Sequence, residues 1–191
     1  MKILVCRSAG GASFAASGGA DSALLREGEP VFIEEPASGW TSDVVLALRI
    51  SRLGTHIPEK FAGRYFDALA AVHRIVPVPE TDAAAVPPFF RDRAFAPGKW
   101  IPLDGSDGDF ALSVCRRSHD GAAVTDEYHA VFSPDALGGA RIVAWLSEYM
   151  TLKTGDIVVL ADTSVALGVP VINSCVEAKI NNMPSLSVRI K

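Results

Sequence analysis

The residue types that most often carry out chemistry are scattered along this chain and do not form a set. Its four histidines fall in a turn, in the central stretch, at a hairpin and in a strand-like run: His56, His73, His119 and His129. A lone histidine more often lies at the surface, or has its hydrogen bonds satisfied in the core, than acts as a catalyst. His73, beside Arg74, is the one histidine that we consider as a catalytic candidate. Ser8, Ser13 and Ser164 have no adjacent base in the sequence. A Ser–His–Asp arrangement stays open, because its members meet only in the fold.

The three cysteines point to no metal or redox motif. Cys6, Cys115 and Cys175 are widely spaced, no pair makes a Cys-x-x-Cys sequence, and no histidine lies at metal-ligand spacing. The apolar surroundings of Cys115 and Cys175 predict buried thiols. Because thiols outside a disulfide framework are typical of reducing compartments, we expect a cytoplasmic protein.

Length and composition narrow the class of protein. The chain has 191 residues, 49% of them hydrophobic, and a formal net charge of −4. We expect a single domain over residues 1–191, and the mild acidity argues against a nucleic-acid partner. No apolar run approaches the roughly 18 residues of a membrane span, so we expect no membrane partner and a soluble protein. The short apolar start before Arg7 predicts a first strand over residues 2–6 rather than a signal peptide.

Periodicity places the elements of the first half. Residues 44–50 alternate between apolar and smaller or polar side chains, which predicts a central strand. Pro58 stands where a helix can begin. The helix is predicted by four apolar residues at helical spacing: Phe61, Tyr65, Leu69 and Val72. Residues 8–20 are almost wholly Ala, Gly and Ser, which predicts a loop. Residues 77–94 are rich in Pro and Ala, which predicts a mobile segment.

The second half predicts more strands and one helix. Residues 110–117 alternate as a strand, and Asp120–Gly121 is a hairpin signal that starts the return strand. Ser133 can cap a helix that begins at Pro134. Further strands are expected over residues 157–160, 176–180 and 186–190. Together these patterns predict an α+β fold.

Three stretches of the sequence resemble a known family. They are residues 46–68 with Arg52–Gly54 at the turn, Ser147 followed by the run Met150–Ile157, and Asp21–Leu25. They are similar to the fumarylacetoacetate hydrolase superfamily in its short, bacterial, single-domain form, and in particular to its 2-hydroxyhepta-2,4-diene-1,7-dioate isomerases and acylpyruvate hydrolases. The matches run, with gaps, over nearly the whole chain. The resemblance implies a β-rich, mixed β-sandwich roll with a few short helices.

The resemblance also shows where the family's metal ligands would fall. Family members hold one divalent cation, usually Mg²⁺ or Mn²⁺, with two Glu on the strand and an Asp further on. Those positions are Asp43, Val45 and Arg74 in this chain. A single carboxylate cannot hold Mg²⁺ strongly, so the resemblance implies a lost metal site and no cofactor. We hypothesise that the Arg74 guanidinium pairs with Asp43 in the cation's place; the alternative is two independent surface charges.

The positions that would touch the substrate are replaced as well. The family's acid and base residues sit on a lid that falls within residues 8–20, which would be degenerate here. Its substrate-binding Lys falls on Phe89 or Phe90, with Arg91 and Arg93 as the nearest cations. Asp162 would repel a carboxylate substrate. The resemblance thus assigns no catalytic or metal residue, and its inferred pocket positions are Asp43, Val45, Arg74, Arg91, Asp162 and Thr163.

Three functions remain open at this point. The preferred one is a non-catalytic member of the family, acting as a dimeric scaffold or as the partner of an active paralogue, in a homodimer or heterodimer. The second is a hydrolase, isomerase or decarboxylase of acylpyruvate-like 2-oxo acids with a rebuilt, metal-independent site, in which Arg74 stabilises the enolate. The third is a module that binds small anions through its Arg residues.

Overall fold

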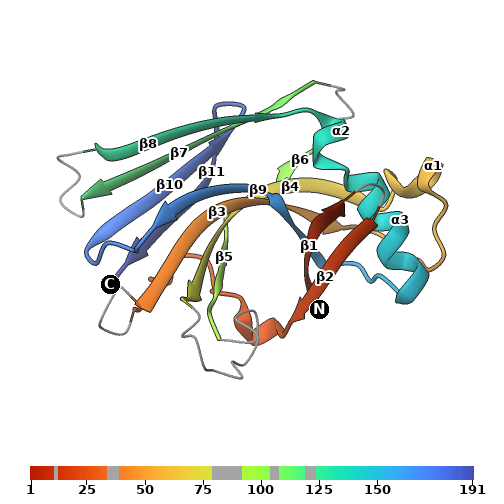
Figure 1. Ribbon diagram of the computed structural model, residues 1–191, viewed down its shortest axis with the longest axis horizontal. Helices are drawn as coiled ribbons and strands as arrows, with labels where there is room; N and C mark the ends of the chain where they lie inside the picture. Colours follow the sequence, from red (N-terminus) through yellow and green to blue (C-terminus); the bar gives the residue numbers. More distant parts are fainter. Residues whose placement is uncertain (11–12, 34–38, 79–91, 104–107, 119–123) are drawn as a thin grey trace.

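The described part of the chain forms two β-sheets and four short helical segments (Figure 1). The computed structural model describes residues 1–10, 13–33, 39–78, 92–103, 108–118 and 124–191. The helical segments are η1 Asp21–Ala23, α1 Glu59–Ala62, α2 Pro134–Leu137 and α3 Gly139–Tyr149. The strands are β1 Ile3–Gly10, β2 Ser13–Gly19, β3 Trp40–Ile50, β4 Phe66–Pro77, β5 Phe95–Pro97, β6 Ile101–Pro102, β7 Phe110–Ser118, β8 Val124–Phe132, β9 Ile157–Gly168, β10 Ser174–Ile180 and β11 Met183–Ile190.

The larger sheet has the strand order β2-β1-β9-β3-β4-β5, with β6 also paired to β4. The smaller sheet has the order β11-β10-β7-β8. Figure 1 shows the smaller sheet lying across one face of the larger one, with the three α-helices gathered at one end. This β-rich arrangement confirms the predicted α+β class and the sandwich-like roll.

The larger sheet is buried on both faces at its centre. On one face, Val44, Leu46 and Leu48 of β3 join the main core, which also contains residues of the smaller sheet and of α3. On the other face, Val45 and Ala47 join a smaller apolar cluster with residues of β1 and β5. A strand buried on both sides is apolar at nearly every position. For this reason the alternation typical of a strand is absent from the sequence of β4.

The predicted helix after Pro58 is wrong over most of its length. Only α1 is helical, and Leu69 and Val72 lie in β4, which pairs antiparallel with β3 from end to end. Because β4 is covered on both faces, its apolar residues do not alternate strictly with polar ones, and some of them fall at helical spacing by coincidence.

The predicted loop over residues 8–20 is also wrong. Residues 3–10 and 13–19 are the antiparallel strands β1 and β2, and β1 pairs in parallel with β9 on its other side. Small side chains give little strand propensity by themselves, but pairing with an existing sheet overrides a weak local preference. The Pro- and Ala-rich segment 77–94 and the turn at Asp120–Gly121 lie mostly outside the described residues, so these predictions are not tested.

Several local predictions are confirmed. The central strand, the strand pair β7 and β8 and the two closing strands are all present. The Ser133 hydroxyl accepts a hydrogen bond from the Ala136 N–H at 3.1 Å and caps α2. Gly138, with a φ of +59°, separates α2 from α3, so the helix is broken where two glycines follow each other. No helix in the described part of the chain is long and apolar enough to cross a membrane.

Candidate functional site

The centre of the candidate site is an ion pair between neighbouring strands. Asp43 of β3 lies directly opposite Arg74 of β4, so both side chains project from the same face of the sheet. The Arg74 Nε donates to Asp43 Oδ1 at 2.8 Å, and its Nη2 donates to Asp43 Oδ2. The two side chains are 11% and 17% exposed, respectively. The hypothesised pairing of Asp43 with Arg74 is therefore present, as a two-point contact of the kind that arginine makes with carboxylates.

A third donor completes the surroundings of Asp43. The hydroxyl of Ser164, on β9, donates to Asp43 Oδ2. An ionised carboxylate offers about four acceptor positions, and three donors occupy this one. In the described part of the chain, no group of three His, Cys, Asp or Glu residues could hold a metal ion. A hard dication prefers several anionic oxygens, so a single carboxylate already bound by a guanidinium does not fit the family's Mg²⁺ or Mn²⁺.

Val45 lies on the same face as Asp43, at the position that the resemblance assigns to a second carboxylate. It is fully buried and lies opposite Val72 in the smaller apolar cluster. Its isopropyl group fills space next to the ion pair and offers no oxygen. The positions that the resemblance assigns to metal ligands are therefore occupied by the Asp43–Arg74 ion pair and by an apolar residue of the core.

Thr163 has a structural role in the fold. Its side chain is buried, its Oγ1 accepts from the Leu46 N–H at 2.8 Å, and it donates to the Leu160 carbonyl at 2.7 Å. The β3–β9 register shifts between Val44 and Leu46, so the hydroxyl satisfies a backbone N–H that the irregular ladder leaves free. Both hydrogen-bonding functions of the hydroxyl are used inside the sheet.

The other two predicted positions do not join the ion pair. Asp162 is exposed, and its carboxylate accepts from the Ser8 N–H at 2.7 Å, which ties β9 to β1. Arg91 lies outside the described residues. Arg93, the neighbouring cation, is exposed and adopts a φ of +61°. Of the six inferred pocket positions, the structure thus brings Asp43, Val45 and Arg74 together.

His73 occupies the opposite face of β4 from Arg74. It lies between Val44 and Ala96 in the sheet, both members of the main core, and it is only 1% exposed. Neither ring nitrogen has a hydrogen-bond partner among the described residues. Burial lowers the pKa of His73 to about 4, against the opposing effect of the negative charge on Asp43. The imidazole is neutral at pH 7 and shares no face with Ser164 or Asp43, so it is not a base for that cluster.

The fold does assemble one Ser–His–acid group that the sequence left open. On the smaller sheet, the hydroxyl of Ser113 lies 3.0 Å from His129 Nδ1, and His129 Nε2 lies 3.6 Å from a Glu127 carboxylate oxygen. The His129 and Glu127 side chains are 65% and 61% exposed. An oriented base needs a close, partly desolvated acid and a cavity for the substrate, and this open strand surface provides neither. We interpret these contacts as hydrogen bonding among solvent-exposed side chains.

Comparison with known proteins identifies the fold. No protein-family model matches the sequence, and no curated protein sequence matches it. Solved structures match over the whole chain. A 2-hydroxyhepta-2,4-diene-1,7-dioate isomerase from Mycobacterium marinum superposes with a TM-score of 0.76 at 17% identity. The superposition covers 99% of this chain and 73% of the isomerase chain.

Two further relatives cover this chain completely. A fumarylacetoacetate hydrolase family protein from Yersinia pestis CO92 has a TM-score of 0.73 at 15% identity, with 92% of its own chain covered. The fumarylpyruvate hydrolase from Pseudomonas aeruginosa, solved in complex with Mn²⁺ and pyruvate, has a TM-score of 0.71 at 14% identity, with 89% covered. The chain therefore has the fold of the fumarylacetoacetate hydrolase superfamily. The resemblance seen in the sequence is confirmed at the level of the fold.

Proposed function

We propose that this chain is a non-catalytic protein of the fumarylacetoacetate hydrolase fold, acting as a dimeric scaffold or as the partner of an active paralogue. The observation that carries the proposal is the Asp43–Arg74 ion pair, because it places a fixed cation where the resemblance expects a metal. A guanidinium is always charged and cannot exchange ligands with a substrate as a metal ion does.

The chemistry of the superfamily argues in the same direction. Its reactions on 2-oxo acids pass through an enolate, whose negative charge must be stabilised by a cation with free coordination positions. The charge of Arg74 is already matched by Asp43 at 2.8 Å. Among the described residues around the pair, we find no histidine or further carboxylate that could move a proton. The fold is retained while the reactive groups are replaced.

A role in assembly is supported by the edge of the larger sheet. Strand β2 is at the end of the strand order, and Ser13–Gly19 contains no charged residue and no proline. Edge strands that must stay unpaired usually carry such residues, because a plain edge is a template for pairing with another chain. Such an edge is consistent with the dimer that the resemblance implies, because it could pair with a second chain.

The metal titration is the first test. Metal-stripped protein is titrated calorimetrically with Mn²⁺ and then with Mg²⁺, and we expect no heat of binding up to millimolar metal. The matched variant carries Val45→Glu and Arg74→Asp, which restores a three-carboxylate set around Asp43, and it is expected to gain Mn²⁺ binding. Circular dichroism establishes that the variant is folded. Stoichiometric micromolar binding by the unmodified protein would overturn the proposal.

The alternatives are separated by two further measurements. Turnover of acylpyruvates by the metal-stripped protein, lost on Arg74→Lys, would instead establish a metal-independent enzyme. Saturable binding of pyruvate or oxalate without turnover would establish an anion-binding module. Light scattering over a range of concentrations tests the dimer, and co-purification with candidate paralogues tests the heterodimer; a chain that stays monomeric and binds no paralogue would exclude the assembly role.

A further inference from the structure

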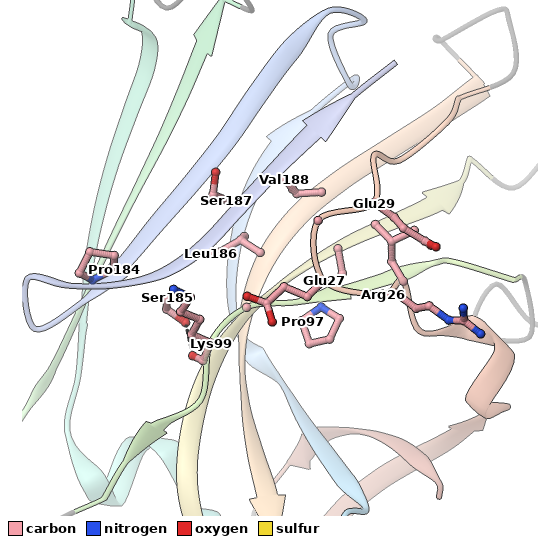
Figure 2. A pocket seen from close by; sticks show the side chains of 14 residues that line it. Arg26, Glu27, Glu29, Pro97, Lys99, Pro184, Ser185, Leu186, Ser187 and Val188 are labelled. Atoms are coloured by element: carbon pink, nitrogen blue, oxygen red, sulfur yellow. Dashed lines mark hydrogen bonds between the residues drawn. The ribbon is translucent and has the colours of Figure 1, made fainter.

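A cavity of about 180 Å³ lies beside the outer edge of β11, and its lining does not include Asp43 or Arg74. Three segments line it: the loop 25–29, residues 96–99 and residues 184–188 of β11 (Figure 2). Leu25, Ala96, Leu186 and Val188 are each at most 5% exposed and supply apolar walls that belong to the main core. The cavity therefore opens from solvent onto the apolar space between the two sheets.

The strand edge in this cavity has a gap in its hydrogen bonding. At one end, the Lys99 N–H donates to the Ser185 carbonyl at 2.6 Å; at the other, the Val31 N–H donates to the Arg189 carbonyl at 2.8 Å. Alternate residues of a strand direct their backbone groups to the same side, so the N–H and C=O of Ser187 face the cavity. No other described segment pairs with Ser187 on this side.

The geometry of the flanking segments keeps the gap open. Gly98 approaches β11 so closely that a Cβ at this position would lie 2.3 Å from the Ser185 carbonyl oxygen. On the other side, the turn at Glu27–Gly28, with a φ of +83° at Gly28, carries the chain away from the strand before it returns at Val31. The two anchored carbonyls are four residues apart, about 13 Å along a strand. This length admits an extended ligand of about two residues.

One charged group is directed into the cavity. Figure 2 shows the Glu27 side chain reaching from the loop across the opening towards Pro97 and β11, while Arg26 and Glu29 turn away from it. Among the described residues, Glu27 makes no ion pair. Lys99 is exposed at the rim. The cavity thus offers a carboxylate, a free strand edge and apolar walls.

We propose that this cavity binds a short aminoacyl compound whose ammonium group pairs with Glu27, whose amide pairs with the N–H and C=O of Ser187, and whose apolar side chain packs on Leu186 and Val188. Addition of an extended segment to a free strand edge is a recurrent mode of peptide recognition, in which the main chain gives affinity and flanking pockets give specificity. This site does not depend on the proposed function, since its lining includes none of Asp43, Arg74 and Ser164. The same chemistry is found in a free amino-acid amide and in the N-terminus of a peptide.

His73 provides a reporter inside the protein. It is the cross-strand neighbour of Ala96, which forms part of the cavity wall, and directly opposite residues have Cβ atoms about 5 Å apart. A ligand seated against Ala96 changes the surroundings of the imidazole. The His73 ring resonances should therefore shift on binding, whereas those of the exposed His129 on the smaller sheet should not.

The test is a titration at pH 7 with leucinamide and with the peptide Leu-Gly-Gly-amide, followed by calorimetry and by the histidine ring resonances. Saturable binding is expected for at least one of them, and their relative affinity distinguishes a small amide from a peptide terminus as the source. N-acetyl-leucinamide keeps the amide and the side chain but lacks the ammonium group, so it should bind at least threefold more weakly. Absence of saturable binding of both amines up to 10 mM, roughly the weak end of specific affinities, would overturn the proposal.

Three variants test the assigned contacts. Glu27 is exposed, so Glu27→Gln should weaken leucinamide binding by about two- to fivefold, as expected for an ion pair in contact with solvent. Glu29→Gln is the matched control and should leave binding unchanged; equal losses in both variants would show general charge attraction and contradict the assignment. Lys99→Gln removes a nearby positive charge and should strengthen binding of the amine slightly, whereas weaker binding would indicate an anionic ligand instead.

Discussion

Strand β4 places two neighbouring polar residues in opposite situations. Arg74 faces the smaller apolar cluster and is held by Asp43 across the strand pair, with Ser164 on the far side of the carboxylate. His73, one residue earlier, faces the main core and has no hydrogen-bond partner among the described residues. The comparison shows that burial alone does not define a functional site. One face holds a directed ion pair, and the other holds an imidazole that stays neutral at pH 7.

The largest effect is expected from breaking the ion pair on one side only. Arg74→Met leaves Asp43 partly buried without its cation and should lower the free energy of unfolding by about 3 kcal/mol. Urea denaturation measures this loss. The double variant Asp43→Leu with Arg74→Met should recover most of the stability, because replacing both charges by apolar groups removes the uncompensated charge. A double variant as unstable as the single one would show that the pair itself stabilises the sheet.

The opposite face predicts a dependence on pH. Burial lowers the pKa of His73 to about 4, from 6.5 in the unfolded chain, so the unfolded state binds more protons between these values. The stabilising contribution is complete above pH 6.5 and is lost as the pH falls towards 4; at pH 5 the loss is about 2 kcal/mol. His73→Leu should remove this part of the pH dependence in urea denaturation between pH 5 and 7. His129→Gln, at an exposed site, is the control, and an unchanged slope in His73→Leu would contradict the assignment.

Removing a buried hydrogen bond within the sheet should lower the free energy of unfolding less than breaking the ion pair does. Thr163→Val keeps the shape of the side chain but removes the acceptor of the Leu46 N–H, so this buried donor loses its partner. We expect a loss of about 1.5 kcal/mol in the free energy of unfolding. Thr163→Ser retains the hydroxyl and is the matched variant. If Thr163→Val costs no more than Thr163→Ser, which loses only the γ-methyl group, the hydrogen bond does not carry the effect.

The smallest effect is expected from an exposed pair on the same two strands. Arg49 of β3 and Asp67 of β4 lie 3.0 Å apart, with side chains 39% and 48% exposed. Arg49→Met should change the free energy of unfolding by about 0.5 kcal/mol, because solvent screens the pair. The contrast with Arg74→Met isolates burial as the cause of the difference. Equal losses from the two substitutions would remove the basis for treating Asp43–Arg74 as a special site.

The elements that could be predicted from the sequence are those with a local signal. The alternation of residues 44–50, the Ser133 cap and the β7 pattern each depend on a few neighbouring residues, and each is present in the fold. The β4 and β2 strands could not be predicted in this way. Their residues are consistent with a helix and with a loop, and only the neighbouring strands β3 and β1 decide the conformation.

The candidate site divides in a similar manner. That Val45 and Arg74 stand at the positions of two expected carboxylates is a prediction from the resemblance of the sequence to the superfamily. The strand register was needed to see that the Thr163 hydroxyl accepts from the Leu46 N–H. It was also needed to see that the His73 side chain faces the core. The cavity beside β11 had no sequence signal, because its walls come from three segments far apart in the chain, residues 25–29, 96–99 and 184–188.

By itself, the sequence determined which reactive side chains are present and where they stand along the chain. It has a strand with Asp43 and Val45, a cation at Arg74, and no metal-binding or catalytic residues at the spacing of a known motif. Side-chain types and local periodicity are properties of neighbouring residues and can be read along the chain. The tertiary structure alone decided which charges meet, which hydroxyls are used and which strand edge stays free. Those outcomes depend on the pairing of residues far apart in the chain, where register and burial set the energy of every polar group.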